Sequence, residues 1–200
     1  MIIDYVKADT MQRYSAETLR TLMGIDIDNA ERVKASGFLP VINTYPEHDP
    51  TLYYTREREG GLKAVEGGYV REHMLVAYDL DTAKARMKAR IAAMRWERET
   101  GGIEIDGMEI LTGAEDLARL TATLNGLTAA GLADTSFKAV NGWATVTLEE
   151  LKAIQAAIVT FTEACFAEER RLDDAVDACG SVAELAALDL ESGWPDRKVE

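Results

Sequence analysis

The chain has 200 residues, of which 47% are hydrophobic, and a formal net charge of −13 at pH 7. This length and composition suit one soluble domain of ordinary size or two small ones. The acidic balance argues against a nucleic-acid partner, because phosphate binding needs clustered lysine and arginine, and no apolar run approaches the roughly 18 residues of a membrane span.

Residues 1–79 predict a small, loop-rich α+β unit. The opening stretch, MIIDYVKADT, lacks the basic and apolar regions of a secretory signal, so we expect synthesis in a cytoplasm. A helix is expected over roughly Ser15 to Ala35, either continuous or broken near Gly24, followed by extended segments with turn residues. The clearest strand is Gly68 to Tyr78, because its aromatic and β-branched residues suit a pleated surface.

A helical pattern begins after this strand, with Asp79 or Asp81 as its cap. Apolar residues recur every three or four positions and form one stripe: Leu80, Ala83, Met87, Ile91 and Met94. The other face is basic and carries Lys84, Arg86, Lys88, Arg90 and Arg95. This face either grips an acidic partner or nucleic acid, or pairs with carboxylates of the chain itself. We favour the second interpretation, because five charges make a weak field in so acidic a chain.

A tight hairpin is predicted after the helix. Gly101-Gly102 ends the helix, and Asp106-Gly107 suits a type I′ turn that places Ile103 opposite Ile110 and Ile105 opposite Met108. Glu104 and Glu109 then meet on the other side, where Arg95 or Arg98 is expected to pair with them. Two such carboxylates also resemble the acid and base of a hydrolase, but exposed hairpin glutamates are far commoner.

The same arrangement follows a second time. Thr112 and Glu115 have the spacing of a capping box, and the helix that they open ends at Gly131. A second hairpin over Phe137 to Val146 is expected to turn at Asn141-Gly142, with Val140 opposite Trp143 and Phe137 opposite Val146.

The longest predicted helix follows, opened by a capping box of Thr147 and Glu150 and running to Cys179. Its apolar stripe is close to a seven-residue repeat and comprises Leu151, Ile154, Ile158, Phe161, Cys165, Leu172, Val176 and Cys179. So long a stripe predicts self-association or packing along another protein. Cys165 and Cys179 lie too far apart on one helix to pair, so we expect them to pack as small apolar residues, with a bridge to a neighbouring chain as the oxidative alternative.

Ser181 and Glu184 predict a short capped helix, after which residues 191–200 form a tail. Trp194 in this tail is expected to pack onto its own domain rather than anchor a partner. The whole chain is thus expected to be α+β, with an N-terminal unit at 1–79 and a helix–hairpin–helix–hairpin–long helix domain at 80–190. Six residues are the expected core or interface anchors: Trp96, Trp143, Ile154, Ile158, Phe161 and Trp194.

No catalytic, cofactor or metal motif stands out. Ser181 and Ser192 have no histidine nearby in sequence, and the glycine pairs fit neither a dinucleotide fingerprint nor a phosphate-binding loop. His48 and His73 are distant from both cysteines, so metal-ligand spacing is missing. We therefore expect a protein that is not an enzyme and needs no cofactor.

The second part of the chain resembles a domain of unknown function found in phage and prophage proteins encoded near tail-fibre and tail-assembly genes. The resemblance covers roughly Asp81 to Ala187 and rests on Arg95-Trp96, Glu99 to Ile103, Gly107, Trp143, Thr147-Leu148 and Ala164 to Phe166. The stretch Gly37 to Val41 and the strand that begins at Gly68 are similar, more loosely, to the front halves of such proteins. The resemblance implies a tail-associated role without known catalytic residues.

Two functions follow from this resemblance. In the first, the chain is a structural protein of the phage tail, at the baseplate or a fibre attachment point, made in the host cytoplasm and retained in the virion. In the second, it is a tail-fibre assembly chaperone that leaves before the virion is complete. Both imply other tail or fibre proteins as partners. We favour the virion component, because strong caps and tight hairpins suit a fixed interface.

Overall fold

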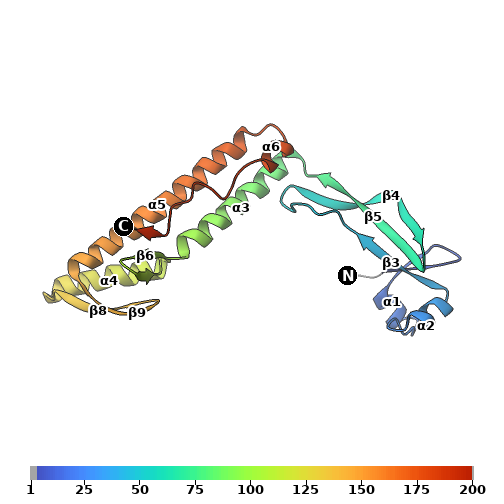
Figure 1. The fold of residues 1–200 in the computed structure, drawn as a ribbon, viewed down its shortest axis with the longest axis horizontal. Coiled ribbons are helices and arrows are strands. Elements are labelled where there is room, and N and C mark those ends of the chain that lie inside the picture. Colours follow the sequence, from blue (N-terminus) through green and yellow to red (C-terminus); the bar gives the residue numbers. More distant parts are fainter. Residues whose placement is uncertain (1–3, 200) are drawn as a thin grey trace. The chain divides into compact units, whose positions relative to one another are not determined.

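The computed structural model describes residues 4–199 and divides the chain into two compact units, Met1–Tyr78 and Asp79–Glu200 (Figure 1). Both helices and strands are present, so the predicted α+β class is confirmed. Residues 191–199, set apart above as a tail, belong to the second unit.

The first unit is built on a five-stranded sheet with the order β2-β1-β3-β5-β4. Its strands are β1 (Asp4–Lys7), β2 (Arg13–Ser15), β3 (Phe38–Thr44), β4 (Tyr53–Val65) and β5 (Gly68–Ala77). β3 and β5 pair in parallel and the other neighbours pair antiparallel. The predicted strand from Gly68 is confirmed and ends one residue earlier than expected.

Two short helices replace the single helix that was one option for residues 15–35. They are α1 (Ala16–Thr21), capped by Ser15, and α2 (Ala30–Ala35), capped by Asn29. Gly24 between them has a φ of 65°, a conformation that favours glycine and interrupts a right-handed helix, so the option of a break at this residue is confirmed. Buried residues from both helices and from two strands form the core of this end: Tyr5, Leu19, Val33 and Phe38.

Arg71 of β5 ties three strands of this sheet together. Its side chain is 2% exposed, and Nη1 donates to Asp4 of β1 at 2.9 Å while Nε lies 3.3 Å from a carboxylate oxygen of Glu57 on β4. Two acidic neighbours offset the free-energy cost of burying one guanidinium group. The contacts of Arg71 therefore stabilise the sheet.

The second unit contains four helices and three strand pairings within its described residues. Its elements are α3 (Leu80–Thr100), β6 (Ile103–Ile105), β7 (Met108–Ile110), α4 (Ala114–Ala130), β8 (Asp134–Ala139), β9 (Gly142–Thr147), α5 (Leu148–Ala178), α6 (Val182–Ala186) and β10 (Lys198–Val199). α5 packs beside α3 along one part of its length and against α4 along another (Figure 1).

Four helix starts test the predicted caps, and the cap of α6 is confirmed, because the Ser181 side chain accepts from the Glu184 amide. Asp79 caps α3, and Thr147 with Glu150 forms the predicted capping box of α5. The box predicted for α4 is wrong, because Gly113 occupies the N-cap position and makes no side-chain hydrogen bond. The hydroxyl of Thr112 is used instead to close the loop after α3: it accepts from the Gly102 amide at 3.0 Å and donates to the Glu99 carbonyl.

The two hairpins differ in how well the sequence predicted them. The first has the expected register, with Ile103 opposite Ile110 and a positive φ at both Asp106 and Gly107. The register predicted for the second is wrong, because Trp143 lies opposite Lys138 and the two turn residues are Val140 and Asn141. Neither turn residue has a positive φ, and contacts with the first hairpin fix them: the Val140 amide donates to the Glu109 carbonyl at 2.8 Å.

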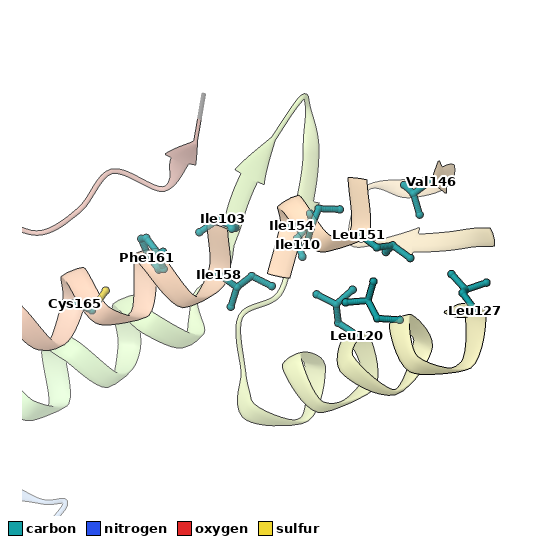
Figure 2. Packing of buried hydrophobic residues seen from close by; sticks show 11 residues of the cluster. Ile103, Ile110, Leu120, Leu127, Val146, Leu151, Ile154, Ile158, Phe161 and Cys165 are labelled. Atoms are coloured by element: carbon teal, nitrogen blue, oxygen red, sulfur yellow. The ribbon is translucent and has the colours of Figure 1, made fainter. Parts of the chain in front are cut away.

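The long stripe of α5 is buried within its own unit. Its first half joins residues from both hairpins and α4 in one core, which comprises Ile103, Ile110, Leu120, Leu124, Leu127, Val146, Leu151, Ile154, Ile158, Phe161 and Cys165 (Figure 2). Glu168 occupies the place that the apolar pattern skips and is also buried. Because the chain itself covers this stripe, the stripe gives no support to the predicted self-association.

The residues after α6 return along the unit and add a strand to it. β10 pairs in parallel with β6, the Glu104 amide donates to the Arg197 carbonyl at 2.8 Å, and Arg197 Nε donates to the Gly102 carbonyl at 2.8 Å. Trp194 is half-buried and its Nε1 donates to the Leu190 carbonyl at 2.8 Å. The prediction that Trp194 packs onto its own domain is confirmed.

Candidate functional site

A groove of about 500 Å³ lies between the two hairpins of the second unit. Residues 109–111 of β7 and its end form one side, residues 135–140 of β8 and its turn form the other, and α4 contributes Asp116, Arg119, Leu120 and Thr123. The turn of the second hairpin contacts the first hairpin, where the Val140 amide donates to the Glu109 carbonyl. Away from this turn the two hairpins separate, and the groove lies between them.

The floor of the groove is apolar and rigid. Ile110, Leu120 and Ile158 line it and are buried members of the unit's main core, as Figure 2 shows from close by. Side chains in a close-packed core do not rearrange easily, so the floor is preformed.

The rim carries large apolar side chains that the chain leaves uncovered. Leu111 is 47% exposed, Val140 is 59% exposed and Trp143 is 72% exposed. Trp143 points away from the core because side chains alternate along β9, and Val146 takes the inner face. The ammonium group of Lys138 lies 5.7 Å from the centre of the Trp143 ring, within the range of a cation–π contact.

Charges of both signs surround the apolar floor. Lys138 and Arg119 supply positive charge, while Glu109 and Asp116 supply negative charge. Arg119 and Asp116 form an ion pair at 3.9 Å, and the arginine is largely exposed. An apolar floor with a mixed polar rim is the composition typical of a protein-binding groove.

The structure separates the six expected anchors. Ile154, Ile158 and Phe161 lie in the core, and Ile158 also reaches the groove. Trp143 stands at the groove, whereas Trp96 is 62% exposed on α3 and does not line it.

Of the groove residues, sequence reasoning singled out only Trp143 and Ile158 as anchors, and it missed the others, Leu111, Lys138 and Val140 among them. Phe137 and Ala139 alternate with the polar residues Ser136 and Lys138, and this alternation indicated which side chains of β8 face the core and which face solvent. No signal in the sequence showed that this strand would face β7.

The basic face of α3 pairs with carboxylates of the same unit. Lys84 donates to the Asp177 carbonyl at 2.8 Å, Lys88 lies 2.7 Å from the Asp177 carboxylate, and Arg95 lies 2.9 Å from Glu169. The hydrogen bond to Asp177 raises the pKa of Lys88. For Lys88 and Arg95, the interpretation that this face pairs with the chain's own carboxylates is confirmed, whereas Lys84 bonds to a backbone carbonyl.

The residues considered for acid–base chemistry fall in different places. Glu104 and Glu109 are directly opposite on the first hairpin, and Lys198 lies 3.5 Å from Glu104. The expected pairing with Arg95 or Arg98 is wrong, because Arg95 contacts Glu99 and Glu169 while Arg98 contacts Glu191 at 2.9 Å.

His48 and His73 belong to the first unit, where their Nδ1 atoms lie 2.9 Å from the Pro46 carbonyl and 3.2 Å from the Thr44 carbonyl. Within residues 4–199, no group of three or more potential metal ligands comes together.

Both cysteines are buried, as the packing interpretation predicted. Burial raises the pKa of Cys165 to about 11, and Cys179 Sγ donates to the Ala175 carbonyl at 3.3 Å. A thiol that is protonated and enclosed is a poor partner for exchange. The alternative of a bridge to a neighbouring chain stays a prediction, and the burial of both sulfur atoms in the folded unit does not favour it.

The chain was also compared with known proteins. No curated protein and no solved structure matches it. Among the described residues, no helix has the length and apolar character needed to cross a bilayer. A family model matches residues 82–192, a segment that contains all but the first two residues of α3, both hairpins, α4, α5 and α6 and therefore the whole groove. Because this segment is more than half of the 200 residues, the chain belongs to the family described as Domain of unknown function (DUF4376).

Proposed function

We propose that this chain is a non-enzymatic structural protein of a phage tail, at the baseplate or a fibre, that works through protein–protein interfaces. The tail assignment rests on the resemblance of residues 81–187 to domains encoded near tail-fibre and tail-assembly genes. The binding role rests on the groove, and above all on one observation: Trp143 is 72% exposed at its edge. Tryptophan is enriched among the residues that dominate binding energy at protein interfaces.

The rigidity of the groove supports a retained component. Its floor belongs to the main core, and its walls are hairpins held by Asn141 and Val140. A preformed surface loses little conformational entropy on binding, which suits a permanent contact. Met87 of α3 is buried, so its flexible side chain does not form part of an adaptable surface.

Quantitative mass spectrometry of purified particles, alongside the lysate of the producing cells, tests this proposal. We expect the chain in the particles at a fixed ratio to the major capsid protein, consistent with a symmetric tail ring or fibre base. Presence in the lysate and absence from the particles would contradict a structural role. Hydrolysis of a host glycan or peptidoglycan that disappears in Glu104→Gln or Glu109→Gln would contradict the non-enzymatic part.

The second candidate, a tail-fibre assembly chaperone, has one observation in its favour. Three methionines of the first unit are exposed: Met11, Met23 and Met74. Flexible, polarizable methionine side chains suit surfaces that accept and release several clients. The particle measurement separates the two candidates, because a chaperone is found with fibre protein in the lysate only.

A further inference from the structure

The groove walls are strand edges whose backbone groups face each other. In an antiparallel pair, every second residue directs its amide and carbonyl groups toward the partner strand. The residues between them direct these groups away from it. The Leu148 amide donates to the Ala133 carbonyl at 2.9 Å, which places Ala133 on the side facing β9. By this alternation Ser136 and Lys138 direct their backbone groups away from β9 and toward the groove.

Two hydrogen bonds confirm this direction. Val140 is two residues after Lys138, so its amide points to the same side as those of Ser136 and Lys138. This amide donates to the Glu109 carbonyl at 2.8 Å. The Glu109 amide in turn donates to Asn141 Oδ1 at 3.2 Å, so β7 presents its own outer edge to β8. The two edges meet at this point and then separate toward Leu111 and Ser136, both of which line the groove.

Beyond that point the edge of β8 is open. Across residues 4–199, no backbone group bonds to Ser136 or Lys138 from the groove side. An exposed strand edge with unpaired amide and carbonyl groups is a template for another strand. The chain uses the same device elsewhere, because β10 adds in parallel to the outer edge of β6.

We propose that the groove binds an extended segment of a partner protein, which adds as a strand to the free edge of β8 between Asp134 and Val140. Backbone hydrogen bonds to Ser136 and Lys138 hold the segment, because groups spaced at alternate residues match only an extended chain. The inference rests on the proposed function only in requiring a protein partner, and it applies to a structural protein and to a chaperone alike.

The side chains of the groove specify the sequence of that segment. Every second residue faces the floor at Ile110 and Leu120 and must be apolar. The residues between them share the outer face with Lys138 and Trp143, where an acidic side chain complements the ammonium group. The preferred segment therefore alternates apolar residues with polar ones and carries a carboxylate near Lys138.

A random heptapeptide display library, selected on the full chain and counter-selected on Lys138→Pro, tests this. Proline removes the amide that faces the groove and is tolerated on strand edges, while Lys138→Ala is the matched control that keeps the amide. We expect enrichment of alternating apolar sequences that still bind Lys138→Ala, more weakly where they carry a carboxylate for the lost ammonium group, and that lose binding to Lys138→Pro. No enrichment, or peptides without alternation, would overturn the proposal.

The enriched peptide itself supplies a second test that does not depend on how the proline variant folds. A copy N-methylated at alternate amides keeps every side chain but loses the donors that pair with β8. We expect its binding to be weaker by about tenfold or more, since loss of two hydrogen bonds of about 1 kcal/mol each reaches that factor. Amide NMR shifts should centre on Ser136 and Lys138.

Two other outcomes would contradict the proposal. Equal affinity of the N-methylated peptide would show that side chains alone bind, and a change of oligomeric state in Lys138→Pro would identify a second copy of the chain as the occupant. Absence of the chain from the particles would contradict the proposed structural role but not the binding of a strand in the groove. Absence of peptide binding would contradict the strand addition but not the presence of the chain in the particles.

Discussion

The side-chain amide of Asn141 donates a hydrogen bond of 2.8 Å to the carbonyl of Gly107, so the turn of the second hairpin is fastened to the turn of the first. The same side chain accepts from the Glu109 amide at 3.2 Å. One asparagine thus satisfies a backbone group in the first turn and another in the strand that follows it, and it sets the end at which the groove closes.

Replacing this asparagine should loosen the two hairpins. We expect Asn141→Ala to lower the free energy of unfolding by about 1–2 kcal/mol, because two hydrogen bonds to backbone groups are lost. Urea unfolding followed by circular dichroism measures the change. Asn125→Ala is the control, since Asn125 is exposed on α4 and alanine favours a helix there; an equal loss in both variants would contradict the prediction.

Two glycine-to-alanine substitutions should act in opposite directions. A Cβ at Gly193 would lie 2.5 Å from Glu168 Oε1, and the residue has a φ of 96°, so Gly193→Ala should destabilise the second unit by more than about 1 kcal/mol. A Cβ at Gly126 meets nothing within 4 Å inside α4, so Gly126→Ala should stabilise by about 1 kcal/mol. Thermal unfolding of both variants checks the signs, and a stabilised Gly193→Ala would refute the close contact with Glu168.

Thr112 tests how the loop after α3 is closed. Its buried hydroxyl accepts from the Gly102 amide and donates to the Glu99 carbonyl, so Thr112→Val should leave a buried amide unsatisfied and cost about 1–3 kcal/mol. Thr112→Ser keeps the hydroxyl and should cost less than half as much. Chemical denaturation of the three proteins measures this, and equal stability of the valine and serine variants would mean that shape alone matters.

The capping box of α5 should make stability depend on pH at the acidic end. Hydrogen bonds from the Thr147 amide and hydroxyl lower the pKa of Glu150. A carboxyl group with a lowered pKa stabilises the fold above its unfolded value of about 4.3, and this contribution disappears as the pH falls through the folded pKa. The stability difference between the wild type and Glu150→Gln should therefore shrink on acidification. Glu149→Gln, at the same helix end but outside the box, should show a smaller pH-dependent change.

Cys165 should be unreactive until the second unit unfolds. Its pKa is raised to about 11, mainly by burial, so almost no thiolate is present near neutral pH. In a Cys179→Ala background, iodoacetamide should label Cys165 only after denaturation, as mass spectrometry can show. The raised pKa favours the folded state below the unfolded value of about 8.5, and this contribution is lost as the pH rises toward 11. Rapid labelling of the native chain would disprove the burial.

Local signals predicted much of the second unit because short-range chemistry decides those features. Asp106-Gly107 permits a positive φ at both positions and so fixes the register of the first hairpin. Thr147 and Glu150 satisfy each other's backbone amides within four residues and so fix where α5 begins.

The errors occurred where a distant partner decided the outcome. Asn141-Gly142 resembles a tight turn, but Asn141 bonds to Gly107 and Glu109, more than 30 residues away, and the turn shifts by one residue. Thr112 forms no cap because its hydroxyl bonds to the loop at Gly102. The groove could not be predicted for the same reason, since it depends on which edge of β8 turns toward β7, and the bonds of Val140 and Asn141 to the first hairpin decide this. A single sequence carries no signal for such a pairing.

The parallel pairing of β10 with β6 also bears on the order in which the second unit forms during synthesis. Residues 198–199 complete a sheet whose other strands were made nearly a hundred residues earlier. α3, α4 and α5 are therefore complete on the ribosome while the outer edge of β6 is still uncovered, and contacts of such long sequence separation close slowly. Hydrogen-exchange pulse labelling of nascent chains should find the Glu104 amide protected last, after the helices that surround it.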